Sequence, residues 1–201
     1  MSVLYKTVAK EAEASQIIEK SRFIAHIKSV SSKEEADNFV AAIRKEYKDA
    51  THNVPAYVIG DKMQIQWGSD DGEPQGTSGA PIVQMLVKEG ITNVCVVVTR
   101  YFGGIKLGTG GLVRAYTSTA KMAIDEAGIF EVRNYENLKV EIPYNLLAKL
   151  QNMEKDMPFT IQEIIYEDTL TVKLLFEAEN RLEIEDFLIN LTNGKFKKII
   201  Q

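Results

Sequence analysis

The stretch Thr99–Arg114, TRYFGGIKLGTGGLVR, combines residue types that could bind an anion. It contains Arg100, Lys106, Arg114 and five glycines: Gly103, Gly104, Gly108, Gly110 and Gly111. Glycine lets backbone N–H groups approach a partner with no Cβ in the way, and successive N–H groups turned inward form an anion-binding nest. Because the last glycines lead into a helical pattern, we expect the positive end of that helix to contribute. The stretch predicts a site for phosphate or carboxylate.

Two phosphate-binding motifs do not fit this stretch. A P-loop requires a lysine after its second glycine, where this chain has Thr109. A dinucleotide fingerprint requires a third glycine, where this chain has Val113. The neighbouring aromatic pair, Tyr101 and Phe102, could stack on bases as rings beside basic residues do in single-strand binders. Equally, one of these rings could fill the core.

A second loop, SDDGEPQGTSG at 69–79, carries three carboxylates within four positions. Its candidate residues are Asp70, Asp71, Gly72, Glu73, Gly76, Thr77, Ser78 and Gly79. The carboxylates could hold a divalent cation or act as acid and base. Alternatively, the loop could pair with the basic glycine-rich stretch, so that the two loops order each other, or both loops could line one anion or polymer site. The sequence leaves these three interpretations open.

Other reactive residues give no site. Ser78 lacks the GxSxG spacing of a nucleophile elbow. His26 and His52 are far apart, which argues against a two-histidine metal site, and Cys95 lies inside an apolar run typical of a core. We therefore assign no catalytic residue, no metal and no cofactor.

The composition limits the class of protein. The apolar content of 45% is ordinary for a soluble globular chain. The single cysteine excludes an internal disulfide, and the N-terminus lacks the apolar segment of a signal peptide, so we expect a cytoplasmic location. Acidic and basic residues balance over 1–135, whereas the net charge of −4 lies in 136–201. Anion binding must come from a local patch.

Hydrophobic periodicity predicts the elements that would position these loops. Strands are expected at 22–30, 56–60, 63–67 and 92–100, and helices at 33–48, 80–90 and 111–128. Ser32 and Glu35 have the spacing of a capping box. The run TNVCVVVTR predicts a central strand buried on both faces.

The composition changes after Asn134: ten of the 13 glycines lie between 68 and 111, whereas only one, Gly194, lies after residue 134. Residues 136–201 show the order β-α-β-β-α-β, the split βαβ pattern of a ferredoxin-like domain. The fold class is thus α+β, with domains at 1–135 and 136–201.

The two motifs SDDGEPQGTSGAP and VVVTRYFGGIKLGTGGLVRAY resemble those of the IMPACT family, in particular its bacterial YigZ/YvyE-type members. The resemblance covers essentially the whole chain. It implies an N-terminal α/β sandwich like domain two of a small-subunit ribosomal protein and a C-terminal ferredoxin-like domain similar to one in elongation factor G. It also implies a link to translation regulation, since eukaryotic relatives look like translation regulators.

The function that we expect is non-enzymatic: binding of RNA or of a ribosome-associated partner through the basic glycine-rich loop. Two other classes stay open. One is an enzyme acting on a phosphorylated or peptide substrate between the two loops, and the other is a module that only binds proteins.

Overall fold

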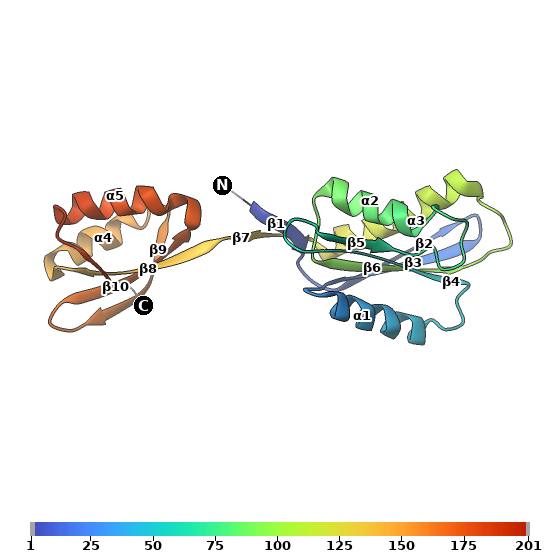
Figure 1. Cartoon of the computed structure of the whole chain (residues 1–201), viewed down its shortest axis with the longest axis horizontal. Helices are drawn as coiled ribbons and strands as arrows, with labels where there is room; N and C mark the ends of the chain where they lie inside the picture. The colour runs from blue at the N-terminus through green and yellow to red at the C-terminus, as the bar shows by residue number, and fades with distance from the viewer. Residues whose placement is uncertain (1–2, 200–201) are drawn as a thin grey trace. The chain divides into compact units, whose positions relative to one another are not determined.

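The computed structural model describes residues 3–199, which divide into two compact units, Leu4–Val132 and the residues from Arg133 onward (Figure 1). Within the described residues no helix is long and apolar enough to cross a membrane. The chain is an α+β protein, and each unit has its own sheet and core.

The first unit contains a five-stranded antiparallel sheet in the order β2-β3-β6-β4-β5. Its elements are β1 Val3–Val8, β2 Ala12–Ile18, β3 Ser21–Ser29, α1 Lys33–Glu46, β4 His52–Ile59, β5 Ile65–Gly68, α2 Gly79–Glu89, β6 Val94–Tyr101, α3 Gly108–Ala127 and β7 Ile129–Arg133. β1 and β7 pair in a separate two-stranded sheet. The strand predicted to be central, β6, is the middle strand.

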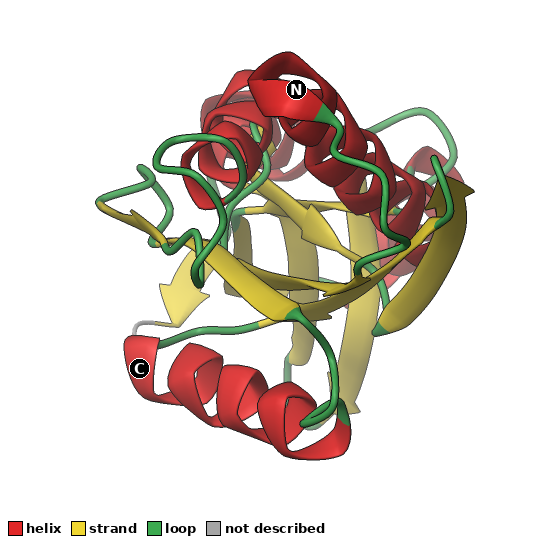
Figure 2. Cartoon of the chain, turned by 90° about the vertical axis from the view of Figure 1, so that its right-hand side faces the viewer, coloured by secondary structure: helices red, strands yellow, loops and turns green. Residues whose placement is uncertain are grey.

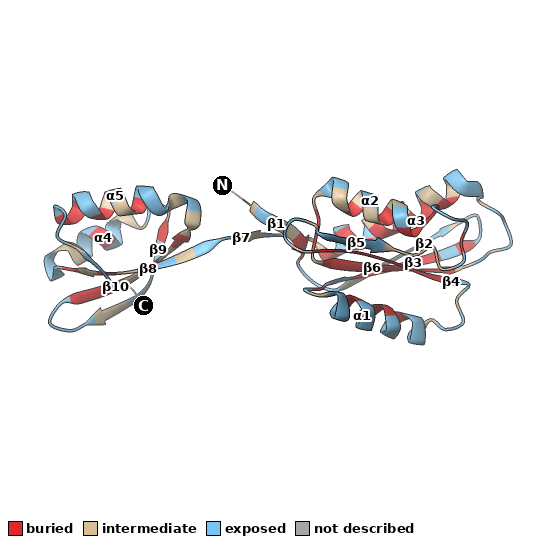
Figure 3. Ribbon diagram, viewed as in Figure 1, coloured by how far each residue is buried: buried red, intermediate tan, exposed pale blue. Residues whose placement is uncertain are grey.

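Helices cover both faces of this sheet, α2 and α3 one face and α1 the other (Figure 1), and the strands run between them (Figure 2). β6 is buried from Val94 to Arg100 (Figure 3). Alternate residues of β6 join two separate cores: Val96 and Val98 pack toward α2 and α3, whereas Cys95 and Val97 pack toward α1. The apolar run therefore reflects burial on both faces, as predicted.

The start of α1 confirms the predicted cap. The Ser32 hydroxyl accepts a hydrogen bond from the Glu35 N–H at 3.2 Å. The reciprocal bond differs from a standard capping box, since the Glu35 carboxylate accepts from the backbone and hydroxyl of Ser31, one residue earlier.

The second unit follows the predicted β-α-β-β-α-β order. Its elements are β8 Tyr135–Ile142, a 3₁₀ turn Tyr144–Leu146, α4 Leu147–Met153, β9 Phe159–Tyr166, β10 Leu170–Glu177, a 3₁₀ turn Ala178–Asn180, α5 Arg181–Thr192 and β11 Lys197–Ile199. The sheet order is β11-β8-β10-β9, with every pair antiparallel. Its core includes Leu150 of α4 and Leu188 of α5.

Candidate functional site

The candidate site lies at one end of β6, around Arg100. Antiparallel pairing places Phe23 of β3 and His52 of β4 directly beside Arg100. Cross-strand partners share a face of the sheet, so these three side chains form a row across it. Phe23 packs in the core on the α2–α3 side, which identifies the face.

Glu73 of the acidic loop reaches this row. Its Oε1 atom lies 2.5 Å from Nη1 of Arg100 and accepts a hydrogen bond of 2.7 Å from the hydroxyl of Tyr116 in α3. The side chains of Glu73 and Arg100 are only 4% and 5% exposed. The two loops are therefore joined by a buried ion pair, as the interpretation of mutually ordering loops predicts.

This placement changes the role of Arg100. We expected its guanidinium to meet an external phosphate, but burial and the bond to Glu73 commit it to the interior. Removing Glu73 from this pair would leave a buried charge without compensation. Burial, and then the hydrogen bond to Glu73, raise the pKa of Tyr116 far above its ordinary value, so its hydroxyl stays a donor.

The other two carboxylates of the loop turn to different partners. Asp71, in the left-handed region at φ 47°, bonds the backbone N–H of Asn53 and the guanidinium of Arg44, both at 2.7 Å. Its carbonyl accepts from Nδ1 of His52 at 2.8 Å. No cluster of three metal-ligating side chains exists among residues 3–199. The three carboxylates of this loop thus turn to separate partners instead of converging on one point.

The carboxylate of Asp70 accepts hydrogen bonds from the N-terminus of α2. Its Oδ1 atom accepts from the N–H groups of Ser78 and Gly79 at 3.0 Å and from the Ser78 hydroxyl at 2.7 Å, while Oδ2 accepts from Gly76 at 2.7 Å. Burial by itself would raise the pKa of Asp70, but these bonds outweigh it and hold the pKa below its ordinary value. Asp70 acts as a remote N-cap, supplied from eight residues upstream.

The remaining residues of the acidic loop build its shape. Thr77 and Ser78 are buried, and the Thr77 hydroxyl donates to the carbonyl of Pro74. Gly72 and Gly76 adopt positive φ. A Cβ on Gly79 would lie 2.6 Å from the backbone of Ser69, so this position accepts only glycine without movement.

The glycine-rich loop leaves its backbone open. α3 begins at Gly108, three residues earlier than predicted, so Gly108, Gly110 and Gly111 belong to the helix rather than to the loop. The N–H groups of Gly108, Thr109 and Gly110 have no acceptor within the described chain, no side chain caps this end, and its first turn holds no acidic residue. These groups are the free donors that an anion would use.

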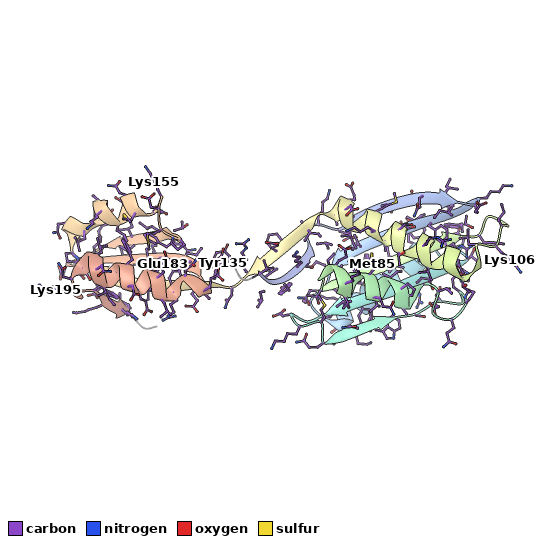
Figure 4. The ribbon with its side chains drawn as sticks, turned by 90° about the horizontal axis from the view of Figure 1, so that it is seen from above. Met85, Lys106, Tyr135, Lys155, Glu183 and Lys195 are labelled. Atoms are coloured by element: carbon purple, nitrogen blue, oxygen red, sulfur yellow. The ribbon has the colours of Figure 1, made fainter. Side chains whose placement is uncertain are left out.

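Two cations lie at this open end. The side chains of Lys106 and Arg114 are exposed, and neither side chain has a hydrogen bond or an ion pair with another residue of 3–199, although the Arg114 carbonyl accepts from the Thr117 hydroxyl. Nη1 of Arg114 lies 3.7 Å from where a Cβ of Gly110 would be, so the guanidinium folds back toward the start of the helix. Figure 4 labels Lys106 in the loop that leads into α3. Both charges add to the positive potential of the helix N-terminus.

Tyr101 and Phe102 have different roles. The Tyr101 hydroxyl donates to Asp49 at 3.0 Å, and the ring is half-buried. Phe102 is 47% exposed, and its backbone N–H bonds the hydroxyl of Thr51 at 3.0 Å. Of the pair, Phe102 is the ring that is open to a ligand.

The next two residues hold the loop in place. A Cβ on Gly103 would lie 2.0 Å from the backbone of Lys20, and its N–H bonds the hydroxyl of Ser21 at 3.1 Å. Gly104 has φ 85° and open space around it.

A pocket of about 430 Å³ lies between the two loops. It is lined by Thr51, His52, Glu73, Pro74, Arg100, Phe102, Lys106, Leu107, Gly108, Thr109 and Leu112. This volume is within the range of small-ligand sites. A wider groove of about 830 Å³ lies on the other side of Lys106 and Leu107, against α2 and the β2–β3 turn.

Sequence reasoning missed three of the pocket's neighbours. His52 and Thr51 come from the start of β4, and Ser21 comes from the start of β3, where its hydroxyl also meets Arg100 at 3.3 Å. Only strand pairing brings these residues to the pocket: His52 of β4, for example, is the cross-strand partner of Arg100 in β6. A histidine before an apolar strand gives no such indication in sequence.

Comparisons with known proteins agree with the two-unit architecture. The family profile described as "Impact N-terminal domain" matches residues 19–124, and "Domain of unknown function (DUF1949)" matches residues 140–195. IMPACT family member YvyE of Bacillus subtilis is 40% identical over 95% of this chain and 88% of its own length. IMPACT family member YigZ of Escherichia coli is 44% identical over 90% of this chain and 89% of its own.

One solved structure covers nearly all of both chains. The crystal structure of a hypothetical protein superimposes with a TM-score of 0.62 at 29% identity, over 98% of this chain and 97% of that one. The arrangement of elements within the units therefore recurs in a related protein.

Proposed function

The chain belongs to the IMPACT family, and on that premise we propose that it binds RNA through the open N-terminus of α3, in a role connected with translation. The link to translation rests on the family resemblance. The choice of RNA rests on the chemistry of the loop, which offers N–H donors and cations but no competing acid.

The uncapped start of α3 is the observation that carries this proposal. The positive end of the helix dipole and the side chains of Lys106 and Arg114 lie together, and like charges at close range repel one another. A phosphate group bound there would relieve this repulsion and would satisfy the free N–H groups of Gly108, Thr109 and Gly110. Phosphate is the repeating anion of RNA, so several such contacts along one strand would add together.

The net charge of the whole chain, −4, does not prevent this site from binding an anion. The Debye length at physiological salt is about 8 Å, so a local patch acts largely on its own. Glu73, the acid of the acidic loop that lines the pocket, is buried and paired with Arg100, so it does not cancel the exposed positive charges. Of the acids that line the wider groove together with Lys106 and Arg114, Glu89 is paired with Lys121 and Glu19 is exposed.

The test is the salt dependence of RNA binding. Wild-type protein and a Lys106→Ala, Arg114→Ala double variant would be titrated with a labelled single-stranded RNA at several salt concentrations. Each lost phosphate contact reduces the slope of log K against log salt by about 0.7. We expect the double variant to bind more weakly, with a slope smaller by about 1.4.

A matched control removes the same charge elsewhere. Lys45 in α1 and Lys62 in the β4–β5 turn are exposed and do not line the pocket, so the Lys45→Ala, Lys62→Ala double variant should keep the wild-type slope. Equal slopes for the wild type and the Lys106/Arg114 variant would overturn the proposal. Recovery of a protein partner without any RNA binding would favour the protein-interaction class instead.

An enzymatic role has one observation in its favour. Nε2 of His52 lies 3.8 Å from Oε1 of Glu73 in the pocket between the loops, an acid and a base in one cavity. Turnover of the RNA during the same titration, abolished by His52→Ala, would support this class.

A further inference from the structure

A stack of planar groups runs outward from the core to the pocket. The Tyr116 and Phe23 rings meet edge to face, with their centroids 5.3 Å apart. The Arg100 guanidinium lies over the Phe23 ring, 5.2 Å from its centroid. The same guanidinium lies 5.4 Å from the centre of the Phe102 ring. Arg100 is thus held between two aromatic rings, one buried and one exposed.

Phe102 is the outer end of this stack. The guanidinium supports one face of its ring through a cation–π contact, and the bond from its N–H to Thr51 fixes its backbone. Nearly half of the residue is nevertheless exposed, and it lines the pocket. An exposed ring that is held from behind is a preformed platform for another planar group.

The lining of the pocket carries both signs of charge. Its acid is Glu73, whose interactions with Arg100, Tyr116 and His52 all involve Oε1. Oε2 accepts no hydrogen bond from the described residues, so the carboxylate can still accept one from a ligand. The positive groups of the lining include Lys106 and the start of α3.

The buried guanidinium of Arg100 also has a hydrogen-bond donor that is not used within the described residues. Nε of Arg100 is buried without a hydrogen-bond partner among the described residues, and Arg100 lines the same pocket. Buried polar atoms are rarely left without a partner, so a water or a ligand has to supply the acceptor for this donor.

We infer that this pocket holds one unpaired nucleobase of a single-stranded nucleic acid, stacked on Phe102. Glu73 repels phosphate, so the neighbouring phosphate lies away from it, on the N–H groups of Gly108 and Thr109. An exocyclic amino group of the base donates to Glu73, and a ring nitrogen accepts from Arg100. This inference rests on the proposed function, because the phosphate site orients the base.

The volume agrees with a single base. A pocket of about 430 Å³ accommodates one ring system with its sugar but no base pair, so a duplex would have to open before it could bind. The site therefore selects single strands through shape, independently of salt.

The first test separates stacking from phosphate binding. Wild-type protein would be titrated with an oligoadenylate of about ten nucleotides and with an abasic strand of the same length. We expect the abasic strand to bind about tenfold more weakly, the range found when a stacked base is lost. In Phe102→Ala the two strands should bind equally well, because the platform is gone.

The conservative variant controls for folding. Phe102 is exposed, and Phe102→Trp keeps an aromatic face, so this variant should restore the preference for the strand with bases. Its indole should also lose fluorescence when the oligoadenylate binds, in a Trp67→Phe background that removes the only native tryptophan.

The outcomes distinguish the two proposals. If the wild type binds both strands equally well, the stacking inference is overturned while the phosphate site stands. If it binds neither strand, the proposed function fails with it. A strand that carries purine in place of adenine tests the amino group, because it stacks alike but lacks that donor. Equal affinity for purine and adenine strands would remove the role given to Glu73.

Discussion

The two helices that cover one face of the first sheet, α2 and α3, both begin at a glycine-rich loop, yet their N-termini differ. At α2 the carboxylate of Asp70 accepts from the N–H groups of Ser78 and Gly79. At α3 no described carboxylate or hydroxyl lies on the first N–H groups, and Lys106 and Arg114 add positive charge. One helix start is closed by the chain itself, and the other is open.

The closed end shows what the open end lacks. The carboxylate on α2 comes from Asp70, eight residues before Ser78, so a helix start in this fold binds a carboxylate that the helix itself does not supply. Composition does not distinguish the two loops, because both are rich in glycine and charge. What distinguishes them is the sign of the charge at the helix start: an acid of the acidic loop caps α2, whereas Lys106 and Arg114 lie at the start of α3.

The largest expected effect comes from breaking the link between the loops. Glu73→Gln would leave the buried guanidinium of Arg100 unpaired, and removal of one partner from a buried pair costs about 3 kcal/mol or more. Urea unfolding followed by the fluorescence of Trp67, which lies in the same unit, would measure the loss of unfolding free energy.

An exposed pair serves as the control for this variant. Lys10 and Glu126 are both 62% exposed and 3.4 Å apart, so Glu126→Gln should change stability by less than about 1 kcal/mol. If Glu73→Gln cost no more than Glu126→Gln, the ion pair would not be what joins the two loops.

Much of the framework could be predicted from local patterns. The apolar run of β6 predicts its central place, and the spacing of Ser32 and Glu35 predicts the start of α1, because both signals come from neighbouring residues. β1, β2 and β7 were missed. β2, AEASQII, is half exposed along its length, so its apolar pattern is weak.

Part of the candidate site could also be predicted, because that part comes from residues that are neighbours in the sequence. The glycines and cations of Thr99–Arg114 lie in one stretch of sequence, so a positively charged helix start could be expected there. The pairing of Arg100 with Glu73 and with Phe23 depends on strands and loops that are distant in sequence. An arginine at the end of a buried apolar strand was the available signal, since such a charge must find a partner inside the protein.

An intermediate effect is expected from opening the closed end. Asp70→Asn removes the negative charge from the N-terminus of α2 and replaces one of its two acceptor oxygens by an N–H donor, which should cost about 1 kcal/mol. The pKa of Asp70 is lowered in the folded state, so its contribution is complete above the ordinary value of 3.8 and is lost as the pH falls through the folded-state pKa.

The pH dependence provides the specific readout for Asp70. Wild-type protein should lose this contribution between pH 4 and lower values, whereas Asp70→Asn should show a shallower loss over the same window, in urea unfolding measured at each pH. Parallel curves for the two proteins would mean that the charge of Asp70 does not stabilise α2.

The smallest change in stability, and the sharpest contrast, comes from closing the open end. Thr109 is exposed in the first turn of α3, so Thr109→Glu would place an acid where α2 already has one. A carboxylate there should stabilise the helix by about 0.5 kcal/mol while it displaces phosphate and weakens RNA binding. Thr109→Gln introduces a side chain of the same shape as glutamate but without its charge, so it should neither stabilise the helix nor weaken RNA binding. Opposite signs for stability and binding are hard to explain unless the N-terminus of α3 is kept uncapped for an external anion; a Thr109→Glu protein that binds RNA as the wild type does would place the RNA elsewhere.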